Sequence, residues 1–368
     1  TWGYGALCWS SFFAWHPTRG WARMVPGGPT RCFMEGMDPA VPLLHVLRGG
    51  LLESVHRGAV MVARGDALEL VRGDPSWVVY YRSTSKPLQA LVGVTSGAAE
   101  AFGFTPEELA LAAGSHSTRP EHVATARSML AKAGIPESAL QCGGHYAFDP
   151  AERRRQRAET DSPLSVWSNC SGKHAMMLAT AKHLGLPLET YLDPRHPVQI
   201  EIRRHIALLG GIDVADVGVG IDGCSAPAFA VPLGAMARSL ARFGAPDALP
   251  ADLAAAARRI GDGMHAHPFM VGGPGRFDTD LMESSAACLL AKAGAEGVHG
   301  SWAPEQGLGL VVKAQDGADR GYRLVMVTLL ERLGLLTAEE AAGLRSRQCD
   351  PVVKSIRGQD VGQLEVVV

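Results

Sequence analysis

A serine and a lysine stand three residues apart in the segment YRSTSKPLQA, as Ser83 and Lys86. Residues three apart share one face of a helix, so the lysine amine can reach the serine hydroxyl there. A neutral lysine beside a primary alcohol is a base next to a nucleophile, which is the chemistry of covalent hydrolysis. One S-x-x-K match is weak by itself, but this one lies where a β-rich run gives way to a helical pattern, which strengthens the hypothesis.

Two cysteines and a second lysine form another candidate group. Cys170 and Lys173 are three residues apart in SNCSGKH, and Cys224 lies in GIDGCSAP. Two thiolates with a nitrogen ligand suit Zn²⁺, although lysine is an uncommon ligand because it must lose its proton. Cysteines far apart in sequence are more often simply buried, so both interpretations stay open. A phosphate loop and a nucleophile elbow are excluded, because Trp167 and Pro227 stand where those motifs need glycine.

Two further polar residues lie in apolar surroundings. Ser115, in GSHS, ends a predicted helix, where it is either a polar cap or a second active-site hydroxyl that relays a proton. Lys292 ends a predicted apolar helical run in CLLAKAGAEGV, where a cation is most often a C-terminal or snorkelling charge. The positions alone leave both alternatives open for each residue.

The bulk composition excludes several classes of protein. The chain has 368 residues, a formal net charge of −2 and 20% charged residues. Both signs are dispersed, so nucleic acid is not an expected partner. No apolar run approaches the roughly 20 residues that a membrane-spanning helix needs. Seven thinly spread cysteines argue against a disulfide framework and favour a reducing, cytoplasmic location.

The order of the predicted elements indicates an α+β fold. Residues 46–83 contain β-rich runs broken by RGD turns, and helical periodicity covers much of residues 87–290. Strands are predicted again in the segments GLGLVVKAQDG and GYRLVMVTLL, followed by a short helical tail. Strands near both ends with helices between them predict one antiparallel sheet formed by the two ends and a helical insertion.

The first 40 or so residues differ from the rest of the chain. They contain four of the seven tryptophans and show no sustained period of 2 or 3.6 residues. We expect residues 1–40 to be an N-terminal extension outside the fold and residues 41–368 to form the folded domain.

Together these segments resemble the asparaginase II family, the rhizobial-type class of asparaginases. The matching pieces occur in order over roughly residues 46–330, and their combination is specific although each is weak. They are GLLESVHRG, YRSTSKPLQA, GSHS, CGGH, SNCSGKHAMML, DPRHPVQ, GIDGCSAP, HPFMVGGPGRFDTDLM, KAGAEGV and VVKAQDG. The resemblance implies a fold similar to serine β-lactamases and glutaminases, which agrees with a sheet formed by both chain ends, and makes residues 41–368 the catalytic domain.

The same resemblance implies hydrolysis of L-asparagine to L-aspartate and ammonia through a Ser–Lys acyl-enzyme. The serines and lysines of the family fall on Ser83 and Lys86, and on Ser115 and Lys292. In the expected mechanism Ser83 attacks the amide and Lys86 takes its proton, while the second pair relays protons. The sequence leaves open whether the two pairs exchange roles.

The resemblance further implies a zinc ion held by Cys170, Lys173 and Cys224. Ligation explains how Lys173 becomes neutral, because the metal replaces the proton. We expect the zinc to orient the substrate, and we expect a homodimer. The substrate-binding residues expected beside it are Arg82, Asp222 and His174.

Two rival functions use the same pocket. A penicillin-recognising serine hydrolase shares S-x-x-K but also needs S-x-N and K-T-G elements, and the sequence has neither. A non-catalytic zinc- or amino-acid-binding protein would bind zinc and asparagine without releasing ammonia.

Overall fold

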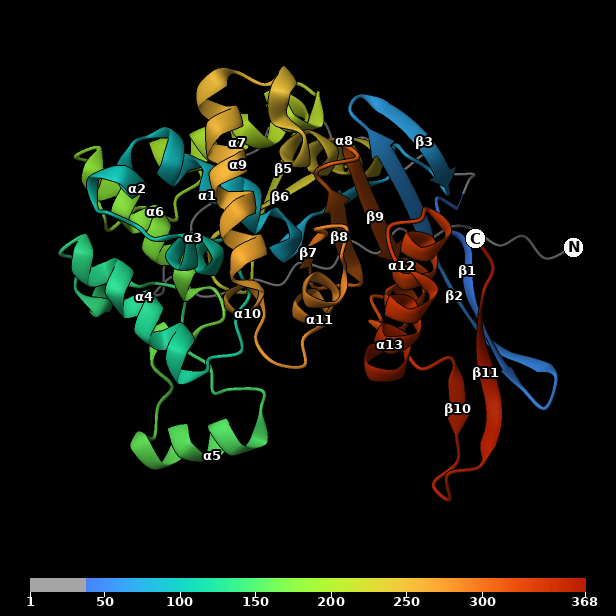
Figure 1. The fold of residues 1–368 in the computed structure, drawn as a ribbon. Coiled ribbons are helices and arrows are strands. Elements are labelled where there is room, and N and C mark those ends of the chain that lie inside the picture. Colours follow the sequence, from blue (N-terminus) through green and yellow to red (C-terminus); the bar gives the residue numbers. More distant parts are fainter. Residues whose placement is uncertain (1–37) are drawn as a thin grey trace, which may run out of the picture. The chain divides into compact units, whose positions relative to one another are not determined.

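The two ends of the described chain pair with each other (Figure 1). In the computed structural model, which describes residues 38–368, β1 (Val41–Arg48) lies antiparallel to β11 (Asp360–Val366). Nearly all of the predicted extension, residues 1–40, lies outside the described residues.

One eight-stranded sheet contains β1 and β11, in the order β10-β11-β1-β2-β9-β8-β7 with β3 paired to β2, as seen within residues 38–368. Every pairing in it is antiparallel. The predicted α+β fold, with one antiparallel sheet built from both ends of the chain, is therefore confirmed. The remaining strands are β2 (Leu51–Arg64), β3 (Ala67–Arg72), β7 (Leu290–Ala293), β8 (Val298–Ala303), β9 (Leu308–Ala314) and β10 (Val352–Lys354).

Helices cover both faces of the sheet centre. All seven residues of β9 are buried, and apart from Lys313 the run LGLVVKA is apolar on both sides of the strand, as expected when neither face meets water. The helix α8 (Leu233–Gly244) and the helix α12 (Arg320–Arg332) both pack against β9. Figure 1 shows α12 lying over one face of the sheet, with α13 (Ala338–Gln348) beside it.

The middle of the chain forms the predicted helical region. Its central helix is α1 (Lys86–Thr95), which is buried from Lys86 to Gly93 and packs against α6, α7 and α9. Pro87 stands at the helix start, where its missing N–H has no intrahelical partner to lose. The other elements are η1 (Arg82–Ser85), α2 (Ala98–Ala101), α3 (Pro106–Ala112), α4 (Pro120–Lys132), η2 (Glu137–Ala139), α5 (Pro150–Glu159), η3 (Ser165–Trp167), α6 (Ser171–His183), α7 (Pro197–Gly210), η4 (Val214–Asp216), η5 (Pro246–Ala248), α9 (Ala251–Ala266), α10 (Pro268–Val271) and α11 (Phe277–Ser284).

A second, three-stranded sheet delivers two loops of the candidate site. Its order is β4-β6-β5, formed by β4 (Val78–Tyr80), β6 (Pro227–Pro232) and β5 (Gly218–Ile221). The chain leaves β4 one residue before η1 begins, and the β5–β6 connection carries Cys224. The sequence predicted helical periodicity over much of residues 87–290, so β5 and β6 correct that expectation.

Two other predictions of secondary structure were wrong. The segment GYRLVMVTLL is not a strand but the body of α12, and the apolar run that ends near Lys292 is not a helix but β7. Both runs are short and mostly apolar, and such runs do not distinguish a buried helix from a buried strand. Pairing with β8 decided the strand, and packing against β9 decided the helix.

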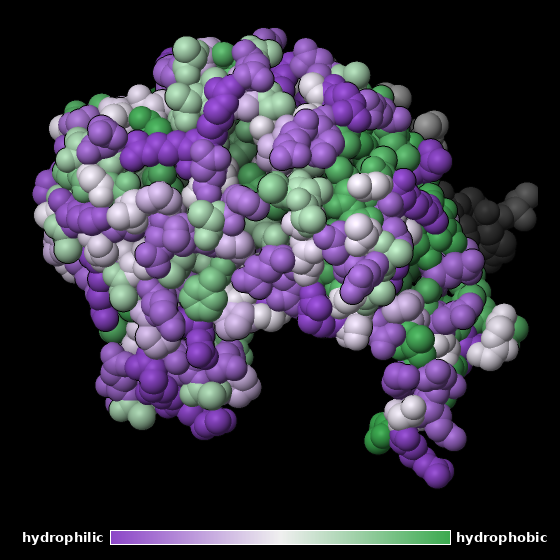
Figure 2. Space-filling model, viewed as in Figure 1, coloured by the Kyte–Doolittle hydropathy of each residue, from purple (hydrophilic) through white to green (hydrophobic). Residues whose placement is uncertain are grey.

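Polar side chains dominate the surface drawn in Figure 2, above all over α5 and over the β10–β11 hairpin, which project on either side of a hollow. Within residues 38–368, no helix is both long and apolar enough to cross a bilayer.

Candidate active site

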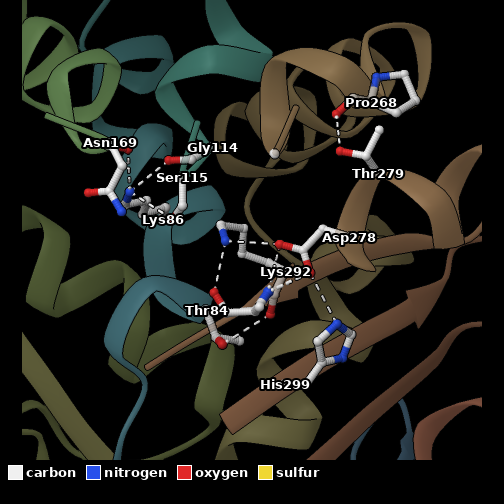
Figure 3. Close-up of polar contacts among 12 residues, drawn as sticks. Thr84, Lys86, Gly114, Ser115, Asn169, Pro268, Asp278, Thr279, Lys292 and His299 are labelled. Carbon is white, nitrogen blue, oxygen red and sulfur yellow. Dashed lines mark hydrogen bonds and ion pairs between the residues drawn. The ribbon is translucent and has the colours of Figure 1, made fainter. Parts of the chain in front are cut away.

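Lys86 and Ser115 form the closest serine–lysine contact of the site (Figure 3). The distance between Lys86 Nζ and Ser115 Oγ is 2.9 Å, and Nζ also lies 2.7 Å from the Gly114 carbonyl oxygen and 3.1 Å from that of Asn169. A neutral amine has two N–H donors and one lone pair. If the two carbonyls accept the two N–H groups, the lone pair faces the Ser115 hydroxyl, which is the arrangement of a base toward an alcohol.

Burial favours the neutral form of this amine. The Lys86 side chain is 1% exposed, and burial lowers its pKa; the Cys170 thiolate opposes the shift and the positive charge of Lys173 adds to it. The other hydrogen-bond partners of Lys86 are two neutral carbonyls and the Ser115 hydroxyl, and the hydrogen bond with the Cys170 sulfur only partly offsets the effect of burial. The surroundings thus favour a lysine that can accept a proton near neutral pH.

Close packing around Gly114 holds Ser115 in place. The Ser115 N–H donates to the Val271 carbonyl at 2.7 Å, immediately after α3 ends. A Cβ on Gly114 would lie 2.6 Å from the Met270 carbonyl oxygen, so only glycine fits this approach. The GSHS motif is therefore a docked turn that presents Ser115, and Ser115 is more than a helix cap.

Ser83 shares a cavity with Ser115. The cavity has a volume of about 240 Å³, and its lining includes both serines, Asn169 and Asp278. Ser83 is half-buried in η1, whereas Ser115 is buried. The hydrogen bonds described for residues 38–368 do not include the Ser83–Lys86 contact suggested by the spacing, because Lys86 Nζ is directed to acceptors from two other segments.

Lys292 belongs to a buried ion-pair network (Figure 3). Its Nζ lies 3.2 Å from Asp278 Oδ2 and 2.8 Å from the Ala293 carbonyl oxygen. Asp278 also accepts from the Ala293 N–H at 2.9 Å and contacts His299 Nε2 at 3.1 Å. In this structure the partner of Lys292 is thus Asp278, while Ser115, the partner expected from the resemblance, is bonded to Lys86.

The charges in this network affect one another's pKa. Burial lowers the pKa of Lys292 to about 8, although the negative charge of Asp278 pulls it upward. Burial alone would raise the pKa of Asp278, but Lys292 and His299 outweigh it and hold that pKa well below its usual range. Asp278 is therefore ionised near neutral pH, when Lys292 is still mostly protonated.

Cys170, Lys173 and Cys224, the zinc ligands that the resemblance implies, lie close together. Lys173 Nζ lies 3.1 Å from Cys224 Sγ, and the thiols of Cys170 and Cys224 share a hydrogen bond. That bond, together with Lys86 and Lys173, holds the pKa of Cys170 well below its usual range despite burial. Burial tends to lower the pKa of Lys173, but the two sulfur atoms outweigh it and raise that pKa.

This donor set fits zinc. Two thiols and one amine converge, and sulfur with nitrogen donors is the combination that Zn²⁺ prefers. No group of three or more His, Cys, Asp or Glu side chains that could hold a metal occurs in the described part of the chain, so a metal here depends on the lysine nitrogen. A metal would have to displace the proton of Lys173. Because the pKa of Lys173 is raised, the proton competes with the metal for the nitrogen.

The single asparagine of the chain connects the two groups. Its backbone carbonyl accepts from Lys86, and its side-chain oxygen lies 3.2 Å from Cys170 Sγ. Asn169 therefore contacts the serine–lysine pair through its backbone and the cysteine cluster through its side chain.

Of the three expected substrate-binding residues, none is in the cavity lining. Arg82 pairs with Asp222, whose Oδ1 lies 3.0 Å from both Nε and Nη2. Arg82 has a φ of 50°, a left-handed conformation that is strained for a residue with a side chain. The pair links the turn carrying Ser83 to the loop carrying Cys224.

His174 follows Lys173 directly in α6. It is buried, its Nδ1 is 2.7 Å from the Tyr191 hydroxyl, and its Nε2 lacks a hydrogen-bond partner among residues 38–368. Burial lowers its pKa well below the usual range, as do the charges of Lys173 and Lys86. Its role in substrate binding stays a prediction.

Sequence reasoning missed Asp278 and His299. Asp278 lies inside the segment HPFMVGGPGRFDTDLM, which contributed to the resemblance without any role for its acidic residues. Asp278 stands in a helix that mixes polar and apolar residues and also contains Asp280, so nothing in the sequence marks Asp278 as the buried carboxylate. His299 carried no distinguishing pattern either.

Comparison with known proteins identifies the family. Residues 44–366 match the family model described as L-asparaginase II. No curated protein matches the sequence. Among solved structures, a β-lactamase from Mycobacterium bovis is 14% identical with a TM-score of 0.39, over 75% of this chain and 94% of that one. A simvastatin synthase variant from Aspergillus terreus is 13% identical with a TM-score of 0.40, over 78% of this chain and 93% of that one. Similarity at this level supports no conclusion about function.

Proposed function

The chain belongs to the L-asparaginase II family, and on that premise we propose that it hydrolyses the side-chain amide of L-asparagine to give L-aspartate and ammonia. The observation that carries this proposal is the contact between Lys86 Nζ and Ser115 Oγ at a cavity shared with Ser83. An amine held by two neutral carbonyls beside an alcohol is suited to activate a hydroxyl nucleophile.

In the proposed first step, Ser83 Oγ attacks the amide carbon, because Ser83 is the more exposed of the two cavity serines. Its proton passes through the Ser115 hydroxyl to Lys86 Nζ. The tetrahedral intermediate then collapses, the carbon–nitrogen bond breaks, and the proton on Lys86 returns along the same route to the leaving ammonia. The product of this step is an ester between Ser83 and the substrate.

In the second step, water attacks the ester carbonyl and gives a proton to the Ser115–Lys86 pair. Cleavage of the ester bond releases L-aspartate and returns the proton to Ser83. The Thr84 N–H already donates to the Tyr81 carbonyl, but the N–H groups of Arg82 and Ser83 at the start of η1 precede any intrahelical acceptor and would stabilise the oxyanion in both steps. Asp278 lines the cavity, and its ion pair with Lys292 places the lysine ammonium next to this lining residue.

We further propose that Cys170, Lys173 and Cys224 hold zinc. A zinc ion with two thiolate ligands would orient and polarise the substrate. Both steps of the reaction use only groups of this chain and one water molecule. The homodimer and the cytoplasmic location stay predictions.

Ammonia release from L-asparagine tests the reaction, and trapping with an electrophilic asparagine analogue followed by peptide mass spectrometry tests the nucleophile. We expect ammonia from L-asparagine and a covalent adduct on Ser83. Binding of zinc and asparagine without ammonia release would favour the non-catalytic alternative, and turnover of a chromogenic cephalosporin would favour the penicillin-recognising one.

A further inference from the structure

A glycine-rich loop, residues 271–276, is docked against the serine segment. The Ser115 N–H donates to the Val271 carbonyl, and Ser117 Oγ donates to the Gly272 carbonyl at 2.8 Å. At Gly273, φ is +101° and a Cβ would lie 1.8 Å from Ser117 Oγ, so a side chain is impossible without a shift. The glycines thus allow the loop to approach the serines closely and hold it there.

This loop ends at Arg276, which lines the same cavity as Ser83 and Ser115. Arg276 is half-buried and stands immediately before α11, the helix that carries Asp278. Its charge is close enough to Lys292 to contribute to the lowered pKa of that lysine. The guanidinium charge therefore affects the buried Lys292 as well as the cavity that Arg276 lines.

The other cations around the cavity already have acceptors. Lys86 has two carbonyls and a hydroxyl, and Lys292 has Asp278 and a carbonyl. Arg323 donates to Asp319 Oδ2 at 2.7 Å and to Gln348 Oε1 at 3.2 Å. The Arg276 side chain, by contrast, has no hydrogen bond or ion pair with any residue of the described range 38–368. It is the cavity cation left free for an anion that arrives from outside.

We propose that Arg276 binds the α-carboxylate of the substrate while the serines meet its amide. This rests on the proposed function and names the substrate class: a free amino acid with a carboxylate at one end and a carboxamide at the other. Guanidinium suits the task because its planar donors match both oxygens of a carboxylate. The site then discriminates against amides that lack the carboxylate, because they leave this arginine unpaired at the cavity.

A matched pair of ligands tests the proposal. L-Asparagine and 3-aminopropanamide share the amide and the amine, and only the first has the carboxylate. Ammonia release would be measured for both ligands with wild type, Arg276→Met and Arg276→Lys. Calorimetric affinities would be measured with the same three side chains at position 276 in a Ser83→Ala background. We expect wild type to prefer asparagine by roughly 30- to 1,000-fold, and Arg276→Met to lose that preference while its affinity for 3-aminopropanamide stays within about 3-fold. Arg276→Lys should keep part of the preference, since it keeps the charge.

The control is Arg127→Met, which removes an exposed arginine on α4 that pairs with Glu137. It should change the affinity for neither ligand. An equal loss for both ligands in Arg276→Met, or an unchanged preference, overturns the proposal. Because Ser83→Ala removes the proposed nucleophile, affinity is measured without turnover. Selective binding of asparagine there, with no ammonia released by wild type, would refute the proposed function and still test the role of Arg276. If Arg276→Met does not fold, Arg276→Lys decides: a partly reduced preference for asparagine supports the proposal, and an unchanged preference contradicts it.

Discussion

Lys86 and Ser115 meet at 2.9 Å although 29 residues separate them, and they belong to different elements. One lies at the start of α1 and the other follows α3. The base and its alcohol are thus assembled by packing between two segments and not by the local S-x-x-K spacing. The two cavity serines consequently have different environments, and replacing them should lower activity to different extents.

The two serines can be separated by substitution. We expect Ser83→Ala to lower kcat on L-asparagine by about 10⁴-fold or more, because the attacking oxygen is lost. Ser115→Ala should lower kcat by about 10²- to 10⁴-fold, because only the proton route is lost, and a slow adduct should still form on Ser83. Steady-state ammonia release and peptide mapping give both results. Ser128→Ala, on α4, is the control, and an adduct found on Ser115 in wild type would reverse the assignment.

The Asp278–Lys292 pair should be costly to break. Asp278→Asn leaves a fully buried ammonium without its counter-charge, so we expect the free energy of unfolding to fall by about 3–5 kcal/mol. Adding Lys292→Met to that variant should recover part of the loss, because an apolar side chain needs no partner. Urea unfolding of both variants measures this. A double variant no more stable than Asp278→Asn alone would show that the lost stability has another source.

Lys292 should make stability depend on pH above neutrality. Its pKa is about 8 in the folded chain, against ~10.4 for an unperturbed lysine. Between those values the unfolded chain binds more protons than the folded chain, so the contribution of Lys292 to the unfolding free energy rises with pH. The stability difference between wild type and Lys292→Met should be flat below about pH 8 and then grow by at most ~1.4 kcal/mol per pH unit. Urea unfolding from about pH 7 to about pH 10 measures it, and a difference that shrinks in this window would mean that Asp278 dominates over burial.

Zinc content should follow the cysteine cluster. We expect wild type purified with zinc to hold about one ion per chain and to lose activity when chelated. Cys170→Ala and Cys224→Ala should each bind far less zinc, and Lys173→Met should weaken binding. Elemental analysis after dialysis gives the content, with Cys288→Ala as the control, since Cys288 is a free thiol in no predicted ligand set. Normal zinc content in Cys170→Ala would exclude this ligand set.

Much of the site was predictable because its signals are local. Ser83, Ser115, Cys170, Lys173 and Cys224 stand in short motifs whose residue types are chemically unusual, and the structure brings both groups together. The α+β architecture was also predictable, since strand and helix periodicities differ over long windows. The short apolar runs at β7 and α12 were not, because burial on all sides removes the periodicity on which such predictions depend.

The sequence alone determined which residue types are available and roughly which elements carry them. Only the tertiary structure decided the pairings: Lys86 with Ser115, Lys292 with Asp278, and Arg276 left free at the cavity. A buried cation takes whatever acceptors packing supplies, and Gly114, Ser115 and Asn169 reach Lys86 from segments far from it in the chain. Spacing along a helix says which side chains can meet, but desolvation and the positions of distant carbonyls decide which of them do.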